Sequence, residues 1–225
     1  MRALSLSVLG LGSVAMVAAA GFASPASAGR QPVESSRAHV TGAPASGDSV
    51  DACYVQGLAN GSGLVSQNFE SKYDDFDSRA ADDFRLKSTC TVKLVTVKGD
   101  YFNGSGPADS VNVILYRNSG GVPGTILKQF ADRPYSDPSG TGNFSIPLPA
   151  TVLQPGLYWV SVRANMDYDP AGEWEWLTNY SLHNNVPVWR NPGDGFGTGC
   201  IDYGSVFDCG FDDEDGGQSF AFTIG

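Results

Sequence analysis

Apolar and polar residues alternate with a period of two through much of the second half of the chain. Successive side chains of a β-strand point to opposite faces, so this period predicts strands with one buried and one exposed face. We expect strands over 111–117, 143–148, 156–166 and 218–224. Their apolar faces carry Val111, Val113 and Leu115; Phe144, Ile146 and Leu148; Tyr158, Val160, Val162, Ala164 and Met166; and Phe220, Phe222 and Ile224.

Turn-forming residues separate the expected strands at intervals of roughly eight to twelve residues, as in all-β proteins. Glycines and prolines in "NGSGP", "NSGGVPG", "DPSGTGN" and "QPG" supply the backbone conformations that tight turns need. Only the segment 73–84, "YDDFDSRAADDF", favours a short helix. The pattern predicts an all-β domain, a single two-sheet antiparallel β-sandwich of the jelly-roll or immunoglobulin-like type.

The first 28 residues have the pattern of a cleaved secretory signal peptide. Arg2 precedes an uncharged apolar run from Leu4 to Ala20, and small residues lead up to Ala28. A membrane anchor fits less well, because Ser, Gly and Pro interrupt the apolar stretch. Residues 29–50 are rich in Ser, Ala, Gly and Pro, which predicts a disordered linker. We therefore expect a secreted protein whose folded domain spans residues 51–225.

The chain is acidic, with 14 basic and 24 acidic residues. Its net charge of −10 becomes −11 when Arg2 leaves with the signal peptide. Nucleic acids and anionic membranes attract basic surfaces, so this charge argues against both as partners. The partners that we expect are an extracellular glycan or a surface protein.

Four cysteines follow the signal peptide: Cys53, Cys90, Cys200 and Cys209. An even number in an exported chain predicts two disulfides, for which three pairings are open. We favour Cys200 with Cys209, because only eight residues with a turn-forming glycine separate them, and this leaves Cys53 with Cys90. Neither pair has the CxxC spacing typical of zinc and redox sites.

Several motifs occur in an order that resembles a sandwich domain of secreted bacterial proteins. They are "SRAADDFRL", "GDYFNGSGPADSVNVILYRNSGGVPGT", "LQPGLYWVSVRANMD" and "VWRNPGDGFGTGC", and the resemblance spans Leu64 to Gly217. It implies an extracellular accessory or surface domain, since no catalytic residue is established for that family. Related domains carry a Trp before the strand that begins here with "TCTVKLVTV". Cys90 lies near that position, which suggests that a bridge to Cys53 replaces some of the aromatic packing.

Motifs for nucleophilic, zinc-dependent or phosphate chemistry are missing from the sequence, which has no G-x-S-x-G, H-E-x-x-H or G-x-x-x-x-G-K. Glycoside hydrolysis needs only two carboxyl groups roughly 5 to 9.5 Å apart. Glu173 and Glu175 would share a strand face at about that spacing. On an exposed face we expect both to titrate normally, unlike an acid catalyst. We therefore expect a non-catalytic protein, with this glutamate pair as the remaining enzymatic alternative.

Acidic clusters at 74–77, 82–83 and 211–217 are candidates for calcium, which accepts oxygen ligands from irregular loops. The last cluster, "FDDEDGG", does not fit an EF-hand, because Phe211 stands where the motif requires an acid. A looser calcium site would combine Asp213 or Asp215 with backbone carbonyls. The alternative is a solvated turn, and no other cofactor is expected.

The stretch "GEWEWLTNY" places Trp174 and Trp176 on one strand face and Glu173 and Glu175 on the other. Unpaired carboxylates are costly to bury, so we expect the glutamates to face water and the two indoles to fill the core. The alternative is a surface platform of aromatic rings for a carbohydrate, made of Trp159, Trp174, Trp176 and Trp189. Buried indoles favour a structural or adhesive domain, whereas exposed indoles favour a carbohydrate-binding module.

Overall fold

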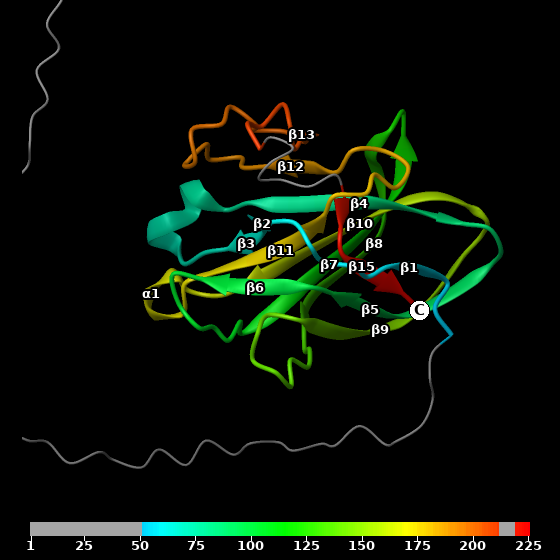
Figure 1. Ribbon diagram of the computed structural model, residues 1–225, viewed down its shortest axis with the longest axis horizontal. Coiled ribbons are helices and arrows are strands. Elements are labelled where there is room, and N and C mark those ends of the chain that lie inside the picture. Colours follow the sequence, from blue (N-terminus) through cyan, green and yellow to red (C-terminus); the bar gives the residue numbers. More distant parts are fainter. Residues whose placement is uncertain (1–50, 212–218) are drawn as a thin grey trace, which may run out of the picture. The chain divides into compact units, whose positions relative to one another are not determined.

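The computed structural model describes residues 51–211 and 219–225, which belong to a unit spanning Gly47–Gly225 (Figure 1). The predicted signal peptide and linker, 1–28 and 29–50, lie outside the described residues. Within the described ranges, no helix has the length and apolar character needed to cross a membrane.

One layer of the fold is a seven-stranded sheet. Its strands, in spatial order, are β13 (Gly204–Ser205), β12 (Val188–Arg190), β4 (Arg79–Leu86), β10 (Gly156–Asn165), β7 (Ser110–Ser119) and β8 (Val122–Arg133), with β3 (Gln67–Asn68) paired to β10. The two-residue pair β3–β10 is parallel, and the other pairs in this sheet are antiparallel.

Two four-stranded antiparallel sheets form the opposite layer. The first contains β1 (Tyr54–Gln56), β15 (Phe222–Ile224), β5 (Cys90–Val97) and β9 (Phe144–Leu153); the second contains β14 (Ser219–Phe220), β11 (Glu173–Asn179), β2 (Gly63–Val65) and β6 (Gly99–Phe102). Only Lys98 separates β5 from β6, and only Ala221 separates β14 from β15. At these two positions the chain passes from one of these sheets into the other through a single residue.

Side chains from all three sheets meet in one hydrophobic core. The core includes Phe84 and Val160 from the seven-stranded sheet and Val95, Trp176 and Phe222 from the opposite layer. Every apolar side chain that the period of two assigned to an inward face belongs to this core. The all-β sandwich prediction is therefore confirmed, with one layer divided between two hydrogen-bonded sheets.

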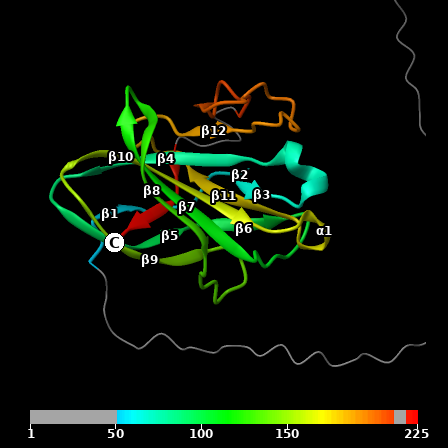
Figure 2. The ribbon, with the colours of Figure 1, turned by 180° about the vertical axis from the view of Figure 1, so that it is seen from behind.

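The segment expected to favour a helix divides into two elements. A 3₁₀ helix, η1 (Ser71–Phe76), occupies its first part, and β4 follows from Arg79. A short α-helix, α1 (Tyr168–Ala171), connects β10 to β11. Both views of the ribbon show η1 and α1 at the same end of the sandwich, with Gly225 toward the other end (Figures 1 and 2).

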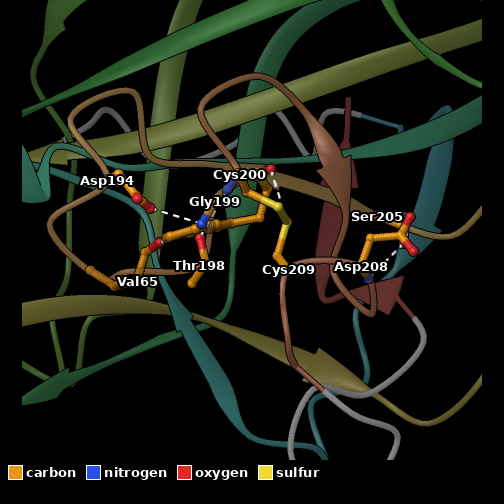
Figure 3. Close-up of a disulfide and its surroundings, with 9 residues drawn as sticks. Val65, Asp194, Thr198, Gly199, Cys200, Ser205, Asp208 and Cys209 are labelled. Atoms are coloured by element: carbon orange, nitrogen blue, oxygen red, sulfur yellow. Dashed lines mark hydrogen bonds between the residues drawn. A yellow bond between two sulfur atoms is a disulfide. The ribbon is translucent and has the colours of Figure 1, made fainter.

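Both predicted disulfides are present. Cys53 is bonded to Cys90 across a sequence separation of 37, and Cys200 to Cys209 across a separation of 9. Figure 3 shows the second bridge and the loop that precedes Cys200, in which Asp194 accepts from the backbone N–H of Gly199 at 2.8 Å. Among the residues that the structure describes, no cysteine is free.

Candidate functional site

A cavity of about 240 Å³ lies at the end of the sandwich that carries η1 and α1. Five side chains line it: Phe69, Tyr73, Phe76, Tyr168 and Glu173. Four are aromatic and the fifth is a carboxylate. We call this cavity the aromatic pocket. Ligand sites in proteins typically combine apolar walls with a few polar groups in this way.

Two of the rings lie side by side in η1, where the backbone bends at Tyr73 (φ −123°, ψ 21°) instead of continuing as a regular 3₁₀ helix. They belong to Tyr73 and Phe76, and their ring centroids are 6.1 Å apart with an interplanar angle of 83°. Tyr168, the first residue of α1, lies 5.6 Å from Tyr73 at 80°. Tyr73 is thus nearly perpendicular to one ring of its own element, Phe76, and to one ring of α1, Tyr168.

Hydrogen bonds hold the elements of the pocket together. The Glu70 carboxylate accepts from the backbone N–H of Tyr168 at 2.7 Å, which ties α1 to the residue that precedes η1. The Asp77 carboxylate accepts from the N–H of Phe69 at 2.8 Å and closes the chain around η1. Glu173 is the second residue after α1 and the first residue of β11, which places it at the pocket.

The loop 191–199, "NPGDGFGTG", packs against η1 from outside. Asn191 donates from Nδ2 to the carbonyls of Asp75 and Asp77 at 2.7 and 2.9 Å. A Cβ at Gly193 would lie 2.4 Å from the Asp75 Cα, so only glycine permits this approach. Phe196 meets Phe76 edge-on at 5.2 Å. This loop therefore supports one wall of the pocket.

The two glutamates of β11 lie in a more apolar setting than the sequence indicated. They are half-buried, and burial raises the pKa of both carboxyl groups, that of Glu175 to about 7. Glu173 and Asp100, which is paired with Glu175 across β6 and β11, add to the second shift. The expectation of normal titration is therefore wrong, because the neighbouring strands remove water from this face.

All four tryptophans are fully buried, each with 0% of its surface exposed. Each indole N–H has an acceptor, so burial leaves no unsatisfied donor. The acceptors are Asn118 Oδ1 for Trp159, the Gly142 carbonyl for Trp174, the Ala221 carbonyl for Trp176 and the Val65 carbonyl for Trp189. Trp174 and Trp176 fill the core as expected. The alternative of an indole platform built from Trp159, Trp174, Trp176 and Trp189 is wrong, because none of these rings presents a face to solvent.

The candidate calcium ligands Asp213 and Asp215 lie outside the described residues. Across residues 51–211 and 219–225, no group of three or more His, Cys, Asp or Glu side chains is placed to hold a metal ion. Asp82 has a different role: its carboxylate accepts from Gln56 Nε2 at 2.8 Å and from the N–H of Phe220 at 2.7 Å. Burial raises its pKa well above the ordinary value. Asp82 thus joins β1 and β14 to β4.

The ring residues of the aromatic pocket were not among the site residues expected from the sequence. A signal was present in the spacing of Tyr73 and Phe76, three residues apart in the one segment that favoured a helix. Phe69 and Tyr168 carry no comparable signal. They reach the pocket through the pairing of β3 with β10 and the hydrogen bond from Tyr168 to Glu70.

Comparison with family models, curated proteins and solved structures finds no match for this chain. The resemblance to secreted bacterial sandwich domains therefore depends on the sequence motifs alone and stays a prediction. Function must be inferred from the site itself.

Proposed function

We propose that the protein is a secreted, non-catalytic accessory or adhesive domain that binds a small group of an extracellular partner in the aromatic pocket. The observation that carries this proposal is the cavity of about 240 Å³ walled by four aromatic rings and one carboxylate. Two disulfides are compatible with an oxidising location outside the cell. The rigid two-layer sandwich would present the pocket at one end.

A fragment screen by NMR tests this proposal. With ¹⁵N-labelled protein and a set of sugars, amines and aromatic fragments, we expect ligand-induced shifts to cluster at Phe69, Tyr73, Phe76, Tyr168 and Glu173. Replacing Tyr73 by alanine should weaken the binding of any such fragment about tenfold, because one ring contact contributes roughly 0.5 to 2 kcal/mol. The matched control is Tyr180→Ala, at a tyrosine that is 49% exposed outside the pocket. Shifts that cluster elsewhere, or affinities equal in both variants, would exclude the aromatic pocket as the binding site.

Glycoside hydrolysis is a second candidate function, favoured by one observation. The pKa of Glu175 is raised to about 7, as an acid catalyst requires, and Glu173 lies two residues away on the same strand face. If the pair is catalytic, Glu175→Gln should reduce hydrolysis of a polysaccharide at least a hundredfold. Hydrolysis that persists in both Glu173→Gln and Glu175→Gln would rule this pair out. A lack of hydrolysis across a polysaccharide panel favours the binding role.

A further inference from the structure

We infer that the aromatic pocket recognises a methylated organic ammonium group, such as the trimethylammonium head of a choline-type molecule. The inference rests on the proposed binding function and adds the chemical class of the ligand. It follows from the electrostatics of the rings, the position of the carboxylate and the shape of the cavity.

The walls of the pocket favour a cation. An aromatic ring carries negative charge on its faces, and a cation within about 6 Å of a ring centroid is attracted to it. The same attraction acts on Lys72, whose Nζ lies 4.7 Å from the centroid of the Tyr73 ring. Rings set nearly at right angles, as Tyr73 is to Phe76 and Tyr168, surround a ligand from more than one side.

The carboxylate of Glu173 adds a formal negative charge to these walls. Among the described residues, the ion pairs within 4 Å are Lys72 with Glu70 and Arg163 with Asp77, so Glu173 has no counter-ion there. Burial raises the pKa of the Glu173 carboxyl, which means that its charge is poorly solvated in the absence of a ligand. A bound cation would offset that cost.

The charged side chains on β11 and on the elements next to its first residue, Glu173, are predominantly acidic. Glu175 lies on the same strand, Asp100 on β6 and Asp169 on α1, whereas the η1 segment supplies Lys72, which is already paired with Glu70. The uncharged phenols of Tyr73 and Tyr168 complete the surroundings. The resulting field attracts a cation and repels phosphate, sulfate or carboxylate ligands.

Methylation distinguishes the expected ligand from a simple ammonium ion. A primary ammonium is compact and strongly hydrated, so moving it into an apolar cavity costs more than ring contacts return. Methyl groups spread the charge over an apolar surface that packs on Phe69, Tyr73 and Phe76. The cavity of about 240 Å³ is several times the roughly 30 Å³ that one water takes up in the liquid, so it accommodates such a head group.

The test compares choline with 3,3-dimethylbutan-1-ol, which has the same shape but carries no charge. Calorimetric titration of the intact protein is expected to give choline at least a tenfold advantage over the neutral alcohol. Glu173→Gln should reduce the affinity for choline about tenfold and leave that for the alcohol unchanged. Retained alcohol binding then shows that the variant is folded. Glu175→Gln makes the same substitution two residues away, outside the cavity lining. Above the Glu175 pKa of about 7 it removes one carboxylate charge and should have a smaller effect, about twofold.

The pH dependence gives an independent readout. A cation binds the ionised carboxylate, so choline affinity should rise with pH through the raised pKa of Glu173 and level off above it. In Glu173→Gln this rise should be reduced to the part contributed by Glu175, and the alcohol should show no rise in either protein.

The outcomes separate the ligand class from the binding function. Equal affinities for choline and the alcohol, or sugars that bind in the pocket while choline does not, would overturn the ammonium inference and leave the pocket as the binding site. If neither probe binds and no fragment shifts the pocket residues, both the inference and the proposed function fail.

Discussion

Replacing Trp176 by alanine is expected to lower the free energy of unfolding by about 3 to 5 kcal/mol. The indole is fully buried, stacks on Phe220 at 4.7 Å and meets Phe222 edge-on at 5.9 Å. Its N–H donates to the Ala221 carbonyl at 3.0 Å, between β14 and β15. The substitution removes these contacts and leaves a cavity in the core. Urea unfolding followed by circular dichroism measures the loss.

An exposed aromatic residue on a neighbouring strand provides the control for this measurement. Phe102 lies on β6, which pairs with β11, and is 53% exposed. Phe102→Ala should change the unfolding free energy by less than about 1 kcal/mol, because surface substitutions away from special features usually have small effects. Equal losses in the two variants would contradict the central role of Trp176 in the core.

Removing the Cys53–Cys90 bridge by a double alanine substitution is expected to lower the unfolding free energy by about 4 kcal/mol. Removing Cys200–Cys209 in the same way should cost about 3 kcal/mol, because the shorter loop restrains the unfolded chain less. The separations of 37 and 9 residues set this order. Chemical denaturation of the two variants and of the parent protein measures both losses.

Each bridge variant serves as the control for the other. Reducing the parent protein should reproduce the sum of the two losses within the error of the measurement. A larger loss for Cys200–Cys209 than for Cys53–Cys90 would show that strain or native packing, rather than loop length, sets the contribution.

The strand faces could be predicted from the sequence because the side-chain period of a strand is local information. Val111, Val113 and Leu115 recur at every second position and so share one strand face, and the structure places them in the core as expected. The disulfide pairing also followed from local spacing. Neither the side-chain period nor the cysteine spacing predicts the order of the strands in the sheets, because that order depends on pairing between residues far apart in the chain.

Trp159 shows where alternation is insufficient. The period of two placed it among the polar residues of its strand, opposite Val160. In the structure it is fully buried in a second, smaller apolar cluster with Ala81, Ile114, Tyr116 and Val188. The outer face of the seven-stranded sheet is thus partly covered. A period reports which side chains share a face, but not what covers that face.

The aromatic pocket could not be predicted for a related reason. Its residues come from the chain before and within η1, from α1 and from the start of β11, and Phe69 and Glu173 are about a hundred positions apart in the sequence. Their approach depends on β3 pairing with β10 and on the packing of the 191–199 loop. The raised pKa values of Glu173 and Glu175 have the same tertiary origin.

The bridge between Cys53 and Cys90 determines how the domain would carry a mechanical load. Cys53 precedes β1, and Cys90 is the first residue of β5, which lies between β15 and β9. A pull on the chain before Cys53 therefore passes through a covalent bond into β5 instead of peeling β1 away from β15. The force is then shared among the hydrogen bonds that β5 makes with its two neighbours, β15 and β9.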